Sequence, residues 1–279
     1  MLTCNLAGGL GNQLFQIFAT ISHAIDSKNS FYFFNAETLG GDGCTKRPTY
    51  WTSFFARLKP FLVTSFPPLS IVRESGFHFT KIPIHYLADR NVCLHGYFQS
   101  YKYFEHNYKT ICKIIGIEQM QLQLQANTIS IHFRRGDYKK VPDFHPLMPY
   151  EYYEQSIEYI LGKKFCKQIL YFCEDEDLED VSPMIDKLQI KFPVCVFLRA
   201  PVILSDWEQM MLMSTCQHNV IANSSFSWWA AYFNPSPDKI VCYPSIWFGQ
   251  VAGHDVRDLC PDTWYQPLKK VEPKPVYQP

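Results

Sequence analysis

Apolar and polar positions alternate between two periods in the second half of the chain. Short runs rich in β-branched and aromatic residues, typical of buried strands, are separated by longer segments with apolar residues at helical spacing. The expected strands cover 128–133, 168–174, 193–198, 218–223 and 238–244, and the expected helices cover 149–161, 206–216 and 225–233. Because strands that alternate with helices form parallel sheets, this half predicts a doubly wound α/β unit.

The first half begins in the same way and then becomes irregular. The expected elements are a strand at 2–6, a helix at 13–25 and a second strand at 31–35. The stretch 40–84 has prolines at 48, 60, 67, 68 and 83, and it predicts only a short helix around 51–58. We therefore expect a βαβ beginning, followed by a largely irregular segment.

The Gln-rich stretch Glu118–Asn127 lies between the two halves, either as a linker or as a helix that joins them. We place the domain boundary there. The predicted domains cover 1–126 and 127–265, and a proline-rich tail follows at 266–279.

Composition narrows the class of protein. With 279 residues, 47% of them apolar, the chain can bury a large core. Lys and Arg total 26, as do Asp and Glu, so the zero net charge argues against nucleic acid as a partner. The N-terminus lacks a signal-peptide pattern, and no window has the ~18 apolar residues of a membrane helix. We expect a cytoplasmic protein, and peripheral association with a membrane stays open.

Ten cysteines are scattered without a C-x-x-C pair, and several lie in apolar runs. Buried free thiols in a reducing compartment are favoured over a disulfide framework. The spacing of His and Cys also does not fit a structural zinc site.

The segment "GGLGNQ" joins the first expected strand to its helix, a context in which backbone amides can hold phosphate. It is not G-x-G-x-x-G, and no acidic residue ends the next strand, which argues against a dinucleotide site. The alternative interpretation is that the glycines serve a tight turn alone. The amides of Asn12 and Gln13 favour a position facing a cleft.

The segment "SIHFRRGDY" ends the strand at 128–133 with two arginines. Alternate residues of a strand share a face, so His132 and Arg134 point one way, and Arg135 points the other way with apolar residues. Because ligands bind at the carboxyl ends of parallel strands, Arg134 is the candidate for a diphosphate. The alternative is an internal Arg–Asp salt bridge, which would explain one arginine but not the whole set. Arg135 is expected to brace the loop through Asp137, unless Asp137 acts on a substrate hydroxyl.

Two more segments follow strands. In "ANSSFSWW" a serine can cap the helix, and the free N–H groups there can alternatively contact phosphate, with the tryptophans as core. In "CEDEDLED" the acids suit a divalent metal, a solvated loop, or a nucleoside contact by Glu174 or Asp175. A metal would be redundant beside Arg134, so we expect none.

With these segments taken together, the chain resembles the α-1,2-fucosyltransferases of glycosyltransferase family eleven. The segments that carry the resemblance, in order, are "GGLGNQLFQ", "HGYFQSYKYF", "IHFRRGDY", "LMSTCQHNVIANSSFSWWAAYF" and "YPSIWF", which span residues 8 to 248. The resemblance implies two Rossmann-like lobes facing a cleft (GT-B type), with the acceptor on the first lobe and the donor on the second. It also implies inverting transfer of fucose from GDP-fucose to the 2-hydroxyl of a terminal galactose, without metal or cofactor.

The resemblance also implies roles for individual residues. Arg134 would meet the donor diphosphate beside His132, and Asp137, then His132, would be the candidate bases. The residues implied in donor binding are Gly11, Asn12, Arg134, Glu174, Asp175, Asn223, Ser224, Ser225 and Phe226. Glu174 stands where the family has Asp, and Gln209, beside Glu208, stands at another acidic position.

Three readings remain open at this stage. The first is the fucosyltransferase, the second is a related transferase with another linkage or donor, and the third is a catalytically silent nucleotide- or sugar-binding protein. Acceptor recognition is expected in the stretches Gly40–Ile84 and Lys139–Pro149, which carry no transferable pattern.

Overall fold

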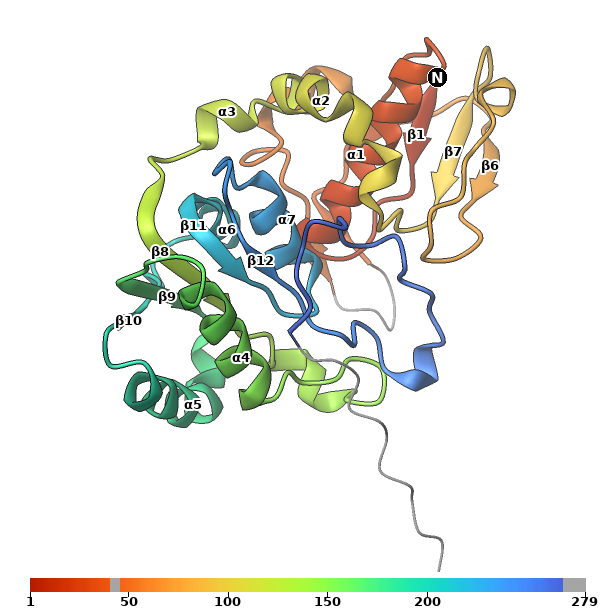
Figure 1. Ribbon diagram of the computed structural model, residues 1–279. Helices are drawn as coiled ribbons and strands as arrows, with labels where there is room; N and C mark the ends of the chain where they lie inside the picture. Colours follow the sequence, from red (N-terminus) through yellow and green to blue (C-terminus); the bar gives the residue numbers. More distant parts are fainter. Residues whose placement is uncertain (41–45, 268–279) are drawn as a thin grey trace, which may run out of the picture.

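Two parallel β-sheets organise the computed structural model, which describes residues 1–40 and 46–267 (Figure 1). The first sheet has the order β1–β7–β6, formed by Leu2–Cys4, Val92–His95 and Ser70–Arg73. The second has the order β10–β9–β8–β11–β12, formed by Val196–Arg199, Gln168–Phe172, Gln125–His132, Cys216–Val220 and Val241–Cys242. All neighbouring strands in both sheets are parallel, which confirms the α/β class.

Helices connect the strands of both sheets. The α-helices are α1 (Leu10–Asp26), α2 (Tyr108–Ile115), α3 (Ile117–Met120), α4 (Tyr150–Leu161), α5 (Leu178–Lys191), α6 (Asp206–Thr215) and α7 (Ser225–Phe233). Short 3₁₀ turns lie at Ala56–Phe61, Ile84–Tyr86, Tyr101–Tyr103, Glu105–Asn107, Gly136–Lys140, Asp175–Asp177 and Gln250–Ala252. Two small strand pairs complete the fold: β2 (Phe33–Phe34) with β5 (Leu62–Val63), and β3 (Thr38–Leu39) with β4 (Arg47–Pro48).

Most elements expected in the second half are confirmed. The helices α4, α6 and α7 match their predicted ranges within one residue, because their apolar spacing and their N-terminal signals agree. At α6, for example, Ser205 and Glu208 form a capping box that fixes the first turn. Helix α5 was not predicted, because the acidic residues of its first turn were interpreted as a loop. Acidic side chains at a helix N-terminus stabilise the helix, since they interact favourably with its dipole.

The first half departs further from expectation. The strand expected at 31–35 shortens to β2, which pairs with β5, and only Phe31 bridges to β1. The stretch 40–84 is less irregular than predicted, because it contains β4, β5 and β6. Strand β6 pairs with β7, a partner more than twenty residues later, so local sequence pattern could not reveal it.

The larger of two hydrophobic clusters extends through both sheets, and the second lies around β8, β9, α4 and α5. Helix α1 lies against α7 at the centre of the molecule (Figure 1), and Phe15 packs on Trp228 with ring centroids 4.5 Å apart. Phe18 and Trp229 make an equal contact, also at 4.5 Å. Both tryptophans are fully buried, which confirms that they belong to the core. The two lobes are therefore joined by apolar packing as well as by the chain.

The lobe boundary near residue 126 stays a prediction. Sheet membership changes between β7 and β8, and the short helix α3 with an extended stretch at 121–124 fills the Gln-rich segment. The tail expected at 266–279 lies almost wholly outside the described residues.

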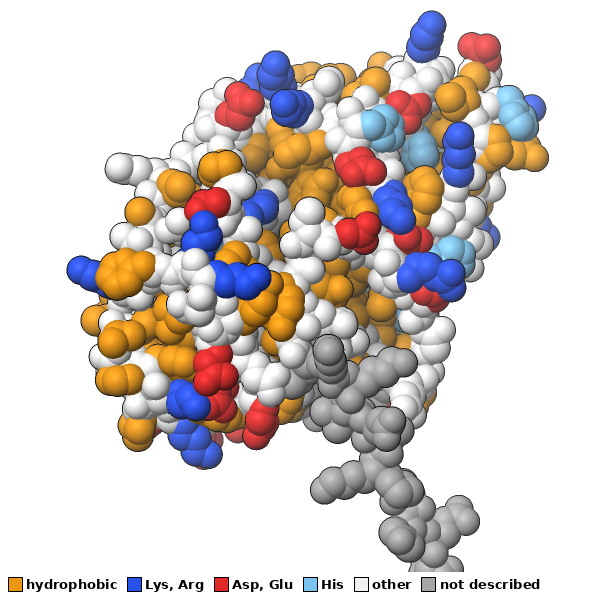
Figure 2. All heavy atoms as spheres, viewed as in Figure 1, with side chains coloured by type: hydrophobic (Ala, Val, Ile, Leu, Met, Phe, Trp, Pro, Cys, Tyr) orange, Lys and Arg blue, Asp and Glu red, His pale blue; other side chains and the backbone are white. Residues whose placement is uncertain are grey.

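Surface and thiol chemistry agree with the composition. Positive and negative side chains are interspersed on the face shown in Figure 2, as zero net charge suggests. The nine cysteines within the described residues are all free, and seven of them are buried. Among the described residues, no helix is long and apolar enough to cross a membrane.

Candidate active site

A pocket of about 660 Å³ lies where the carboxyl ends of the strands of both sheets meet. The first sheet contributes the turn after β1 and the segment after β7, and the second contributes residues after β8, β9 and β11. This arrangement of two α/β lobes on either side of a pocket confirms the predicted fold. Ten of the predicted site residues line the pocket: Gly11, Asn12, His132, Arg134, Asp137, Glu174, Asn223, Ser224, Ser225 and Phe226. Arg135 and Asp175 do not.

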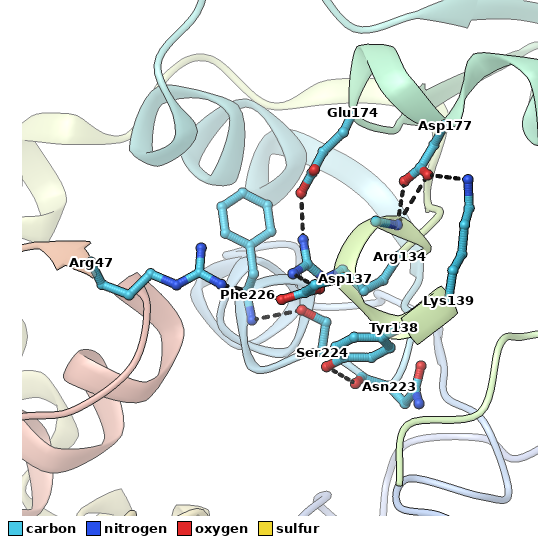
Figure 3. Close-up of polar contacts among 11 residues, drawn as sticks. Arg47, Arg134, Asp137, Tyr138, Lys139, Glu174, Asp177, Asn223, Ser224 and Phe226 are labelled. Carbon is cyan, nitrogen blue, oxygen red and sulfur yellow. Dashed lines mark hydrogen bonds and ion pairs between the residues drawn. The ribbon is translucent and has the colours of Figure 1, made fainter. Parts of the chain in front are cut away.

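Arg134 is the most strongly organised charge in the pocket. Its guanidinium donates to Glu174 through Nη1 and to Asp137 through Nη2, and it lies 5.1 Å from the centre of the Tyr138 ring (Figure 3). Burial lowers the pKa of Arg134, but the two carboxylates outweigh burial and leave the pKa raised. Arg134 is therefore a fixed positive charge, oriented by two acids and facing the pocket.

The expected partnership between Arg135 and Asp137 is wrong. Arg135 Nε lies 3.4 Å from Asp180 on α5, and both oxygens of Asp137 are used elsewhere. One accepts from Arg134, and the other lies 3.2 Å from Nη2 of Arg47, which reaches across from the first lobe (Figure 3). Because the chain leaves the extended conformation after β8, strand alternation no longer determines where residues 135 to 137 point.

A buried carboxylate fixes the loop that carries Arg134. Asp177 is only 1% exposed, and its two oxygens accept from the Gly136 N–H at 3.0 and 2.8 Å. Lys139 Nζ neutralises it at 2.9 Å. In the sequence Asp177 is only one of several acids in an expected loop, and its bracing role depends on the position of the start of α5 beside the loop that follows β8.

Asn12 joins the two lobes at the floor of the pocket. Its side-chain oxygen accepts from Gln99 Nε2 at 2.9 Å and from Ser225 Oγ at 2.7 Å. By contrast Gln13 is fully buried and donates to the carbonyls of Gly8 and Pro48, so it does not face the pocket as expected. The glycine turn therefore works chiefly through close packing and through Asn12.

The N-terminus of α7 opens into the pocket. Ser224 caps the helix, accepting from the Phe226 N–H at 3.3 Å, which confirms the capping interpretation. Asn223 donates to the carbonyls of Pro146 and Trp247, at 3.0 and 3.1 Å. The dipole of this helix, whose first residues line the same pocket as Arg134, favours an anion there.

His132 lies buried between Arg134 and Phe226, whose ring centroid is 5.5 Å away. Burial, and then the charge of Arg134, lower the pKa of His132 to about 3. The imidazole is therefore neutral at every ordinary pH and a very weak base.

Asp175, one of the two acids predicted to contact the nucleoside, pairs with Arg199 at 2.5 Å and is turned away from the pocket.

Several lining residues were missed in the sequence. Tyr50 reaches from the first lobe and donates its hydroxyl to Asp206 at the start of α6. Asp206 thus supplies the acid expected near Gln209, while Glu208 caps the helix instead. Arg47 and Phe77 also line the pocket from the stretch that was expected to be irregular. The sequence had linked this stretch to the site only through its expected role in acceptor recognition.

No group of three or more His, Cys, Asp or Glu residues within residues 1–40 and 46–267 could hold a metal ion. The acids of the pocket are instead engaged with arginines and a tyrosine: Glu174 and Asp137 contact Arg134, and Asp206 accepts from Tyr50.

Comparison with known proteins decides the family. Residues 49–244 match glycosyl transferase family 11. The chain belongs to this family. Two Escherichia coli relatives support the assignment. The O-antigen biosynthesis glycosyltransferase WbnK is 33% identical over 62% of this chain, and an alpha-1,2-colitosyltransferase is 27% identical over 95% of this chain and 98% of its own length. The match to WbnK covers only 59% of that protein.

Among solved structures, E. coli ADP-heptose lps heptosyltransferase II is similar, with 10% identity, a TM-score of 0.46, and coverage of 95% of this chain and 89% of that one. E. coli heptosyltransferase WaaC with ADP-2-deoxy-2-fluoro heptose has 9% identity and a TM-score of 0.45, with coverage of 95% of this chain and 91% of that one.

Proposed function

We propose that this family 11 glycosyltransferase transfers fucose from GDP-fucose to the 2-hydroxyl of a terminal galactose, with inversion and without metal. The observation that carries the proposal is the position of Arg134, a fixed cation beside the pocket into which the N-terminus of α7 points. The two carboxylates use only one donor on each terminal nitrogen of the guanidinium, so its other N–H groups could donate to a diphosphate while the carboxylates hold it in place. The donor diphosphate would then lie against positive charge from both sources.

The reaction needs charge stabilisation more than a strong base. As the bond from fucose C1 to the β-phosphate breaks, negative charge grows on the leaving group, and Arg134 together with the α7 N–H groups would stabilise it. His132 is too weak a base, and both oxygens of Asp137 are occupied in this structure. We infer that the acceptor hydroxyl attacks an oxocarbenium-like sugar with little help from a base.

A direct assay tests the proposal. Purified protein is incubated with GDP-fucose and a panel of β-galactosides in the presence of EDTA, and linkage analysis identifies the product. We expect an α-1,2-linked fucosyl product and no loss of rate with EDTA. Failure to transfer to every galactoside would refute the proposal, and a rate that depends on added metal would refute metal independence.

A second candidate donor follows from a relative. The alpha-1,2-colitosyltransferase matches 95% of this chain, so a GDP sugar other than GDP-fucose is the alternative substrate. Competition between donors separates the two. If colitose is the preferred sugar, unlabelled GDP-colitose would suppress the transfer of labelled fucose at a concentration well below that of GDP-fucose.

A further inference from the structure

The pocket has two chemically different sides. Strand order places β9, followed by Glu174, on one side of β8, and β11 and β12 on the other. Trp247 and Phe248 come shortly after β12 and line the pocket on that second side. Arg134, at the end of β8, therefore separates an acidic side from an aromatic side.

Six rings form a continuous wall on the aromatic side. Neighbouring ring centroids are 5.8 Å apart from Tyr97 to Phe77, 4.1 Å from Phe77 to His254 and 4.9 Å from Phe77 to Phe248. From Phe248 the wall continues to His145, with ring centroids 5.6 Å apart, and from His145 to Tyr138, 4.4 Å apart. Tyr138 in turn contacts Arg134. This aromatic wall consists of Phe77, Tyr97, Tyr138, His145, Phe248 and His254, all of which line the pocket.

Buried polar atoms beside the wall lack partners. Gln99 Oε1 and Asn223 Oδ1 belong to side chains only 6% and 1% exposed, and neither atom has a hydrogen-bond partner within the described part of the chain. His145 Nδ1 is in the same condition. Buried acceptors without donors are costly. Gln99 and Asn223 line the pocket although these oxygens are themselves covered, so a ligand that brings hydroxyl donors and displaces the side chains slightly would recover that free energy.

We propose that the aromatic wall, with Gln99 and Asn223, is the acceptor subsite, and that it binds a pyranose ring of the acceptor glycan. This inference rests on the proposed function. A pyranose combines a C–H face, which can lie on Phe77, with hydroxyl groups that can donate to the unpartnered oxygens.

The guanosine of the donor fits the other side of the pocket better. Guanine presents N–H donors along one edge, and a carboxylate such as Glu174 is a suitable acceptor for them. With the diphosphate on Arg134, a pyranose on the aromatic wall would approach the sugar carbon from the side away from the nucleoside. That separation is what an inverting displacement requires.

The test compares Phe77→Ala with wild type in two binding measurements. Saturation-transfer NMR with a panel of β-galactosides, lactose included, and saturating GDP reports saccharide contact, and calorimetry reports GDP affinity. We expect Phe77→Ala to weaken saccharide binding by about tenfold and to leave GDP affinity unchanged. Phe77→Tyr should restore saccharide binding. Phe165→Ala, which removes a 67% exposed ring outside the pocket, is the matched control.

Three outcomes would overturn the inference: unchanged saccharide binding in Phe77→Ala, an equal loss of GDP affinity, or no saccharide contact in the wild type. The second would assign the aromatic wall to the nucleoside. The proposed function fails differently, through saccharide and GDP binding with no transfer.

Discussion

Arg134 shows how much the surroundings of one residue decide. A lone arginine at the end of a strand would be mobile, but here Glu174 and Asp137 hold both terminal nitrogens, and Asp177 fixes the adjacent turn. The charge is therefore positioned before any ligand arrives. Such pre-organisation is what makes electrostatic stabilisation of a leaving group effective, because no reorganisation is needed during the reaction.

We expect Arg134→Ala to lower kcat by roughly 10²–10³, the cost typical of losing one preorganised contact to developing charge. Steady-state kinetics with GDP-fucose would measure the loss, with thermal unfolding to verify the fold. Arg90→Ala removes an exposed arginine outside the pocket and should retain full activity. An Arg134→Ala enzyme with wild-type kcat would contradict the diphosphate role.

A substitution at Asp137 can distinguish a role in bracing Arg134 from a role as catalytic base. Asp137→Asn keeps an oxygen for Arg134 but removes basicity. Since both carboxylate oxygens already contact arginines, we expect kcat to fall by less than about tenfold, against the ~10²–10⁴ typical of a lost general base. Single-turnover kinetics would measure the chemical step, and a loss within the larger range would identify Asp137 as the base.

At the level of elements, the contact between α1 and α7 holds the pocket together. Asn12 on α1 accepts from Ser225 on α7, and the backbone of these two helices approaches closely at Gly11. A Cβ atom at Gly11 would lie 2.4 Å from the carbonyl carbon of Ser225 and 2.6 Å from the nitrogen of Phe226. The glycine is thus required for packing between the lobes, and not only for a turn.

Gly11→Ala should therefore destabilise the protein by roughly 1–3 kcal/mol, because backbone atoms cannot give way as side chains do. Gly9→Ala is the control: its added Cβ meets nothing within 4 Å, and its φ of −76° suits alanine. Urea unfolding of both variants would measure the difference. Equal stability of the two would show that the helices separate at little cost.

At the scale of the whole molecule, buried thiols link stability to pH. Burial raises the pKa of Cys4, Cys216 and Cys242 from 9.0 to about 12 in the folded chain. Below pH 9 both the folded and the unfolded thiols are protonated, so they make stability independent of pH there. Between about 9 and 12 only the unfolded chain loses these protons, which favours unfolding.

We therefore expect the free energy of unfolding to fall as the pH rises from 9 toward 12, by up to about 1.4 kcal/mol per pH unit for each of these thiols. Urea unfolding at several pH values would measure the slope. A variant with alanine at Cys4, Cys216 and Cys242 should have a shallower slope, whatever its absolute stability. Identical slopes would show that other groups dominate.

The sequence by itself determined the parallel α/β class, the helices α4, α6 and α7, and the burial of both tryptophans. It also predicted ten of the residues that line the pocket, which are fewer than half of the lining. Most of these predictions depend on local signals: period, caps, and polar residues placed directly after strands, which a parallel sheet brings to one edge. The same reasoning found Arg134 and the segment Asn223–Ser225, and the family resemblance added Phe226.

Only the tertiary structure decided the partners. Arg135 pairs with Asp180, Arg134 with Asp137 and Glu174, and Asp177 with the Gly136 N–H, because each partner lies on an element separate from the strand and side-chain directions past its end follow packing. Arg47 and Phe77 likewise reach the pocket from a stretch without a local pattern, and Asp206 reaches it from a predicted helix whose position beside the pocket depends on packing. Contacts between residues far apart in sequence depend on how elements pack, and no local signal encodes that arrangement.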